Sequence, residues 1–132
     1  MTDTVIITII GRQPEIDSEP TIEKCSGLYA LKNGHHFIRY ENEGVRTLIK
    51  ITSDSLSVTR SGKLVSQMDF ISGRATSTIY HTPYGDFDTD IFTKAISIAQ
   101  GAERITVHVI YDLTMTGKHI SECDLTIEIK PE

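Results

Sequence analysis

The sequence predicts an all-β protein, a single antiparallel up-and-down β-barrel of about eight to ten strands that spans residues 1–132. Apolar and polar residues alternate with a period of two through most of the chain, which is typical of strands with one buried face. Turn residues such as Asn33-Gly34 and Thr116-Gly117 separate these runs at short intervals. A succession of hairpins closes most economically as a barrel, because closure removes exposed sheet edges.

The first strands follow from residue type as well as from alternation. Residues 4–12 are rich in Val, Ile and Thr, which favours an extended strand. Residues 13–20 contain prolines and acidic side chains, so we expect a solvated loop there. Residues 22–31 alternate again, and Asn33-Gly34 then predicts a tight hairpin into a strand at 35–41.

The central strands are separated by short turns such as Glu43-Gly44, Ser53-Asp54 and Ser72-Gly73. Pro83 cannot donate a hydrogen bond to a neighbouring strand, so we expect the segment around it to form a turn as well. The central strands are therefore expected at residues 46–52, 56–60, 64–70 and 75–82.

The last third of the chain shows the same alternation, with one ambiguous stretch. Residues 87–93 form a strand in this interpretation, and the aspartates that alternate with its inward residues face water. Residues 94–102 fit a strand or a short helix, because their Ala and Ile residues suit either period, and we favour the strand. Strands at residues 105–113 and 122–129 complete the predicted barrel.

Composition limits the class of protein. Hydrophobic residues make up 39% of the chain and charged residues 23%, as in ordinary globular domains. Thirteen basic against eighteen acidic residues give a net charge of -5, which disfavours nucleic-acid binding. A positive groove would have to be assembled from scattered residues such as Arg39, Arg46, Lys50 and Arg60.

The N-terminal residues and the cysteines bear on location and on redox state. The first apolar run extends only from Val5 to Ile10 and lacks the preceding basic residues of a signal peptide, so we expect a cytoplasmic protein with no membrane span. Cys25 and Cys123 match no metal-binding pattern, and we expect both to be buried, reduced thiols. No cofactor is predicted.

Seven short segments carry a resemblance to a known family. In chain order they are residues 5–13 (VIITIIGRQ), 27–29 (GLY), 38–41 (IRYE), 59–62 (TRSG), 68–70 (MDF), 80–85 (YHTPYG) and 110–113 (IYDL). With these segments the chain resembles the YwiB-like bacterial family of unknown function, small proteins with a calycin-type (lipocalin-like) β-barrel. The resemblance spans nearly the whole chain and implies that fold and a bacterial, cytoplasmic origin. It brings no activity and no catalytic residue.

Arg60 follows Leu56 and Val58 at two-residue spacing, so this charged residue stands at a position where the alternation predicts an inward apolar side chain. Two interpretations are open. Either Arg60 lies at a strand end and extends into solvent, or it points inward at the mouth of a cavity. A barrel of this size is filled by side chains or holds one small ligand, and the short chain favours the filled form.

An inward Arg60 would belong to a cluster of aromatic and polar side chains. The candidate ligand-binding residues are Arg60, Tyr40, Tyr80, His81, Tyr111 and Arg39. Tyrosines supply an apolar wall with hydroxyl donors, and arginine binds carboxylates and phosphates. The cluster therefore suits a small organic ligand that carries an anionic group.

No catalytic residues are predicted, because the serines lie in no nucleophile motif and the glycines in no phosphate-binding loop. A metal site would need His36, His81 and His108 from separate strands, and none is predicted. The favoured function is thus non-enzymatic binding of a small molecule. The alternatives are a protein-interaction or structural module acting as a homodimer, and an enzyme that uses His81, Tyr80 and Arg60 at the barrel mouth.

Overall fold

The computed structural model describes residues 3–16 and 18–132, and these residues form ten strands and no helix. The strands are β1 (Thr4–Arg12), β2 (Thr21–Lys32), β3 (His35–Asn42), β4 (Val45–Ile51), β5 (Ser55–Gly62), β6 (Ser66–Ile71), β7 (Ala75–Thr82), β8 (Gly85–Gln100), β9 (Ile105–Met115) and β10 (Lys118–Pro131). The predicted all-β fold class is confirmed. Asp17, in the predicted loop at 13–20, lies outside the described residues. Nowhere in the described chain is there a helix that could cross a membrane.

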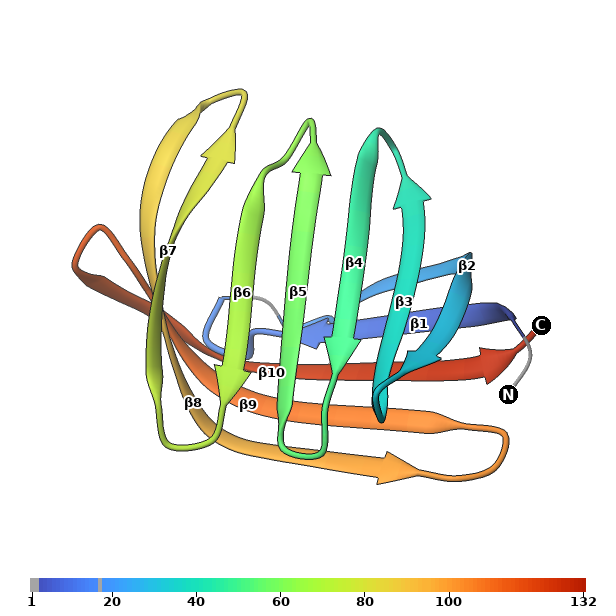
Figure 1. Ribbon diagram of the computed structural model, residues 1–132. Coiled ribbons are helices and arrows are strands. Elements are labelled where there is room, and N and C mark those ends of the chain that lie inside the picture. Colours follow the sequence, from blue (N-terminus) through green and yellow to red (C-terminus); the bar gives the residue numbers. More distant parts are fainter. Residues whose placement is uncertain (1–2, 17) are drawn as a thin grey trace.

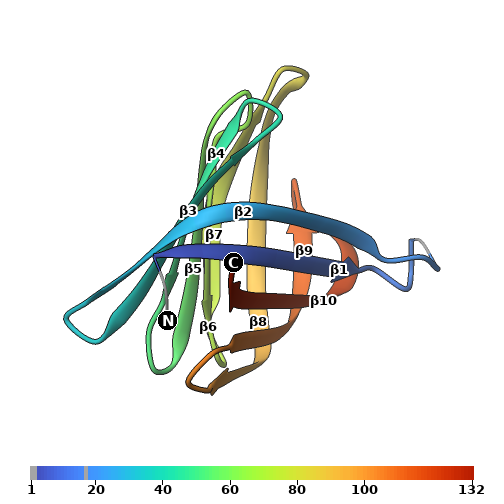
Figure 2. The same ribbon diagram turned by 90° about the vertical axis from the view of Figure 1, so that its right-hand side faces the viewer.

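The strands form one antiparallel sheet in the order β6-β5-β4-β3-β2-β1-β10-β9-β8-β7. Each strand therefore pairs with its neighbours in the sequence, except that β6 and β7 are the two ends of the sheet, and β1 also pairs with β10 over eight residue pairs. In Figure 1, β3 to β6 stand upright in front of β1, β10 and β9, which run across behind them. Figure 2 shows the same crossing from the side. The sheet curls over itself, as the predicted up-and-down barrel requires.

The barrel closes incompletely between β6 and β7. These consecutive strands meet at Val65 and His81, whose backbone groups exchange hydrogen bonds of 3.0 and 2.9 Å. Thr76 Oγ1 donates a further hydrogen bond of 2.9 Å to the carbonyl of Asp69. Elsewhere in the described sheet, strands adjacent in sequence pair over five or more residue pairs, so β6–β7 is the weak seam of the barrel.

Three of the predicted turns have the backbone that their sequence requires. Asn33, Glu43 and Thr116 have φ of 53°, 52° and 49°, and each is followed by a glycine with positive φ. Two successive residues with positive φ define the type I′ turn, which suits the twist of a hairpin. Glycine adopts this backbone without steric cost.

Residues 94–102, the ambiguous stretch, begin inside a strand, because β8 continues to Gln100. A β-bulge between Thr93 and Ala95 interrupts its pairing with β9. Thr93 is buried before the bulge, whereas Ile96 and Ile98 pack against the core after it, so the inward phase changes from odd to even positions. This phase change explains why the stretch fits no single period.

Aliphatic side chains fill one end of the barrel. On β3 to β6 two rows of cross-strand neighbours supply Ile38, Ile49 and Val58, and then Ile51, Leu56 and Phe70. Ile7, Ile105, Val107, Val109, Ile127 and Ile129 face them from the other strands, each with at most 1% exposure. The filled form that the short chain favoured is therefore present at this end.

Candidate functional site at the barrel mouth

A polar row lies directly above the aliphatic rows of β3 to β6. In the register of the sheet Tyr40 pairs with Thr47, Thr47 with Arg60, and Arg60 with Ser66. Because side chains alternate between faces, these four residues share the inward phase of Ile38, Ile49 and Val58. Arg60 is thus one member of a polar layer across four strands.

Above this layer the barrel opens into a pocket of about 600 Å³. The turns β3–β4, β5–β6 and β7–β8 all lie at this end of the molecule, at the top of Figure 1. The pocket is lined by Glu23, Asn42, Glu43, Val45, Thr47, Arg60, Lys63, Leu64, Thr82, Pro83, Tyr84 and Phe87. Its volume falls in the range of small-molecule sites, whereas the opposite end of the barrel is packed.

Arg60 has an unusual position, because its charge is half-buried and lacks a protein partner. Among the described residues no carboxylate lies within ion-pair distance of its guanidinium, and no side chain hydrogen-bonds to it. Burial raises the pKa of both Tyr40 and Tyr111, and the charge of Arg60 offsets a small part of that rise. A half-buried cation without a counter-ion is costly, and a bound anion would remove that cost.

Glu23, an acidic residue of the same pocket, already accepts hydrogen bonds from two other side chains. The hydroxyl of Tyr40 donates to Glu23 Oε1 at 3.1 Å, and the amide of Asn42 donates to Oε2 at 2.7 Å. Burial, more than any other factor, raises the pKa of Tyr40 to about 12. Tyr40 therefore stays a neutral donor at physiological pH, and the mouth keeps a fixed hydrogen-bond network beside Arg60.

Further polar groups of the interior lie beside Arg60, at Ser66, and on β8 and β9, at Thr93 and Tyr111. The Tyr111 ring packs edge-on against Phe70 with centroids 5.0 Å apart, and burial, followed by Cys123, raises the pKa of its hydroxyl. The hydroxyls of Ser66 and Thr93 are buried and have no hydrogen-bond partner in the described structure. Buried hydroxyls normally have partners, so this region has unused hydrogen-bonding capacity.

Four of the six predicted ligand-binding residues face the interior, and two do not. Arg60, Tyr40, Tyr80 and Tyr111 lie on inward faces, whereas Arg39 and His81 are exposed on the outside. His81 is 47% exposed and pairs with Asp86 at 2.8 Å. Adjacent residues of a strand point to opposite faces, so Arg39 cannot accompany Tyr40, nor His81 accompany Tyr80.

This placement also separates the residues of the enzyme hypothesis, because His81 lies outside the barrel while Tyr80 and Arg60 lie inside. The three side chains share no cleft.

Among the described residues no three His, Cys, Asp or Glu side chains converge as metal ligands. Both cysteines are free thiols, as predicted, and Cys123 is buried. The prediction that Cys25 is buried is wrong, because Cys25 is only half-buried on β2, a strand whose inward side chains are all partly exposed.

Several residues of the mouth were not predicted from the sequence, among them Glu23, Asn42, Lys63 and Phe87. They come from four separate parts of the chain, and alternation alone does not bring them together. One signal was available: in a meander, alternate turns lie at the same end of the barrel. The turns that follow β3, β5 and β7 therefore had to surround one opening.

Fold and site together define a class: a ten-stranded antiparallel β-barrel with one filled end and one polar, open mouth. A family model described as "Domain of unknown function (DUF1934)" matches residues 7–127, and the chain belongs to this family.

One relative is known in sequence and in structure. The chain is 23% identical over 111 residues to the uncharacterized beta-barrel protein YwiB of Bacillus subtilis (strain 168), covering 80% of this chain and 78% of that protein. It also resembles the crystal structure of the ywiB protein, with a TM-score of 0.76 at 20% identity over 98% of this chain and 90% of that one. The structural likeness supports the fold. The predicted family resemblance is confirmed.

Proposed function

We propose that this protein binds a small anionic organic molecule at the barrel mouth, with Arg60 contacting the anionic group. The observation that carries the proposal is the half-buried, inward Arg60 that has no carboxylate partner among the described residues. Folding leaves such a charge unpaired only at a cost, which a ligand's carboxylate or phosphate would offset. Arginine is well suited to this role because its planar group donates two parallel hydrogen bonds.

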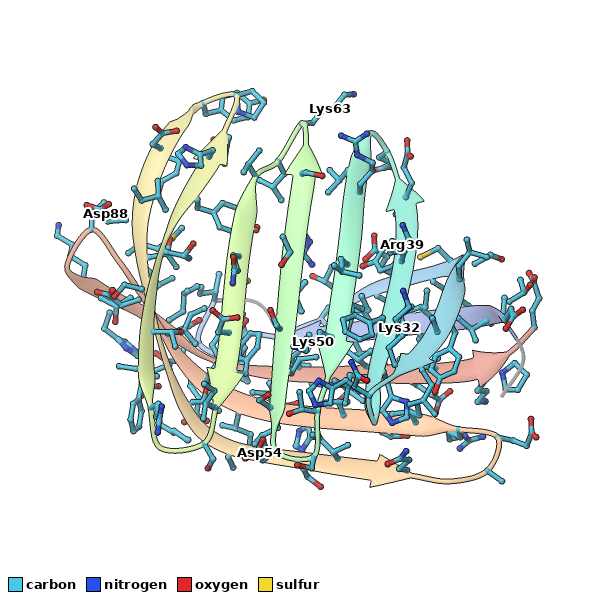
Figure 3. All side chains as sticks on the ribbon, viewed as in Figure 1. Lys32, Arg39, Lys50, Asp54, Lys63 and Asp88 are labelled. Carbon is cyan, nitrogen blue, oxygen red and sulfur yellow. The ribbon has the colours of Figure 1, made fainter. Side chains whose placement is uncertain are left out.

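The rest of the pocket favours a ligand with an apolar body. Val45, Leu64, Pro83 and Phe87 line the wall, and the ring of Tyr84 is 93% exposed at the rim. An exposed aromatic ring beside an apolar wall is suited to cover a bound organic molecule. Lys63, on the β5–β6 turn at the top of Figure 3, adds a second cation at the entrance. Together these residues suit an anion with an attached apolar group.

The proposal is tested by titrating the purified protein with inorganic phosphate, citrate and phenylacetate while the melting temperature is recorded. We expect at least one of these anions to raise the melting temperature of the wild-type protein, because a ligand that binds only the folded state stabilises it. Arg60→Gln should abolish that shift.

Arg39→Gln is the matched control, since it removes the same charge from the outer face of β3, which β4 separates from β5. The control should respond to the anion like the wild type. An equal shift in all three proteins would contradict the proposal, because the anion would then act without Arg60. A lack of any shift in the wild type would contradict it as well.

A further inference from the structure

The outer surface of β9 and β10, together with Lys94 at the bulge of β8, carries charges that are largely paired within the protein. Lys94 contacts Glu122 at 2.6 Å and Asp112 at 3.5 Å. Arg104 and Lys130 both pair with Glu128, at 3.7 and 3.2 Å. This side of the barrel is laced with ion pairs and has little need of a charged partner.

The outer surface of β2 to β4 is different. Lys32, Arg39 and Arg46 are exposed there, and none of them has an ion pair among the described residues. Arg39 lies between the side chains of Leu28 and Leu48, its cross-strand neighbours, which are 59% and 37% exposed. We call this outer surface, centred on Leu28, Arg39 and Leu48, the basic face.

The basic face is hollowed. Two adjoining concavities of about 630 and 640 Å³ both include Leu28, Arg39 and Leu48 in their walls. Lys50 lies above the Phe37 ring, 5.7 Å from its centroid, and extends the basic surface. The same walls hold the acidic residues Asp3 and Glu41, which are outnumbered by the cations Lys32, Arg39 and Arg46. Exposed leucines in a concave surface with an excess of cations suit an acidic partner with apolar side chains.

The chain itself presents such a partner surface on the outside of β7 and β8. Ile79 and Phe92 are 48% and 42% exposed there, and each lies beside outward aspartates of β8. Asp88 is the cross-strand neighbour of Ile79 and has no side-chain partner among the described residues. We call this surface the acidic face. In Figure 3 Asp88 lies at the left edge of the molecule, away from Lys32, Arg39 and Lys50.

We propose that the basic face of one molecule binds the acidic face of a second copy of this chain. Each face offers two exposed apolar side chains and charge of the sign opposite to that of the other face, so a contact between them pairs the charges left unpaired in the single molecule. A two-fold contact of the basic face with itself would instead bring Arg39 near its own copy. The contact is thus head-to-tail, which builds open chains or rings. It does not depend on the ligand proposed for the mouth.

Analytical ultracentrifugation over a range of protein and salt concentrations tests the proposal. We expect reversible self-association that weakens as salt rises, because exposed charges are screened. Arg39→Glu and Asp88→Lys should each weaken self-association roughly tenfold or more, because like charges then meet in the contact. An equimolar mixture of these two variants should associate again, since the altered basic face of one fits the altered acidic face of the other.

Arg12→Glu and Glu103→Lys make the same changes in charge at exposed positions outside both faces, and they should associate like the wild type. A wild-type protein that stays monomeric at all concentrations would overturn the proposal. So would a basic face that binds a labelled nucleic acid or an acidic peptide without any self-association, or a mixture of variants that fails to associate.

Discussion

The two ends of the barrel use the same strands for different purposes. On β5, Leu56 and Val58 are buried in the aliphatic end with 1% and 4% exposure, whereas Arg60, two residues further on, lies in the mouth with no ion pair among the described residues. On β4, Ile49 is fully buried and Thr47 belongs to the polar row. The buried apolar side chains of the aliphatic end stabilise the fold. The mouth can therefore keep polar groups that do not contribute to the free energy of folding.

The largest effect is expected in the aliphatic end. Ile49→Ala removes a fully buried side chain and should lower the free energy of unfolding by about 2–5 kcal/mol. Thr47→Ala, on the same strand in the polar row, should cost only about 1 kcal/mol because it removes one hydroxyl and one methyl group. Urea denaturation measures both. Equal losses would show that the two ends contribute alike to stability.

A smaller effect tests the backbone of the mouth. Gly62 has φ of 102°, and a Cβ there would lie 2.3 Å from the carbonyl oxygen of Gly44 in the neighbouring turn. Gly62→Ala should therefore destabilise by more than about 2 kcal/mol. Gly73→Ala, at φ of 75° but with no atom within 4 Å, should cost only about 1 kcal/mol. Thermal unfolding measures the loss of stability in each variant. If Gly62→Ala lost as little stability as Gly73→Ala, the mouth would be mobile enough to accommodate the added Cβ.

The raised pKa of Tyr40 predicts a loss of stability at high pH. Its folded-state pKa is about 12, above the usual value of 10, so the neutral form is favoured by folding. This contribution is complete below pH 10 and is lost as pH rises from about 10 to 12. Tyr40→Phe should reduce that loss by roughly 2–3 kcal/mol. Urea denaturation at pH 8, 10 and 11.5 measures it, and identical pH profiles would contradict the assignment.

The smallest effect on stability is expected at Arg60 itself. Arg60→Met keeps much of the apolar stem and removes a charge that has no partner in the described structure. We expect the free energy of unfolding to rise by less than about 1 kcal/mol, because the variant no longer buries an unpaired charge. Urea denaturation without added anions checks this. A large loss would mean that Arg60 stabilises the fold by a contact within the protein.

The strands and turns were predictable because alternation and turn residues act locally. Asn33-Gly34 and Thr116-Gly117 each require a backbone that few residue pairs adopt, so they locate hairpins without knowledge of the rest of the fold. The bulge at Thr93 and Ala95 was not predictable, since its phase change resembles a short helix in the sequence. The weak seam between β6 and β7 arises from the closure of the whole barrel, which no local pattern encodes.

The candidate site was predictable only in part. Arg60 stood out because a charge at an inward position contradicts its surroundings, and the structure places it inward. Tyr40 and Tyr80 were predicted together with their neighbours Arg39 and His81, although a strand can turn only one residue of each pair inward. Glu23 was missed because its partners, Tyr40 and Asn42, lie on the next strand, and alternation along β2 does not show which side chains meet across the hairpin.

The most direct test of the central claim is native mass spectrometry of the protein purified gently from its own cells, before and after denaturation. If the mouth binds an anionic organic molecule through Arg60, the native wild-type protein carries a stoichiometric extra mass that is lost on denaturation and is absent from Arg60→Gln. Wild-type protein of bare mass, or the same extra mass on Arg60→Gln, would contradict the claim.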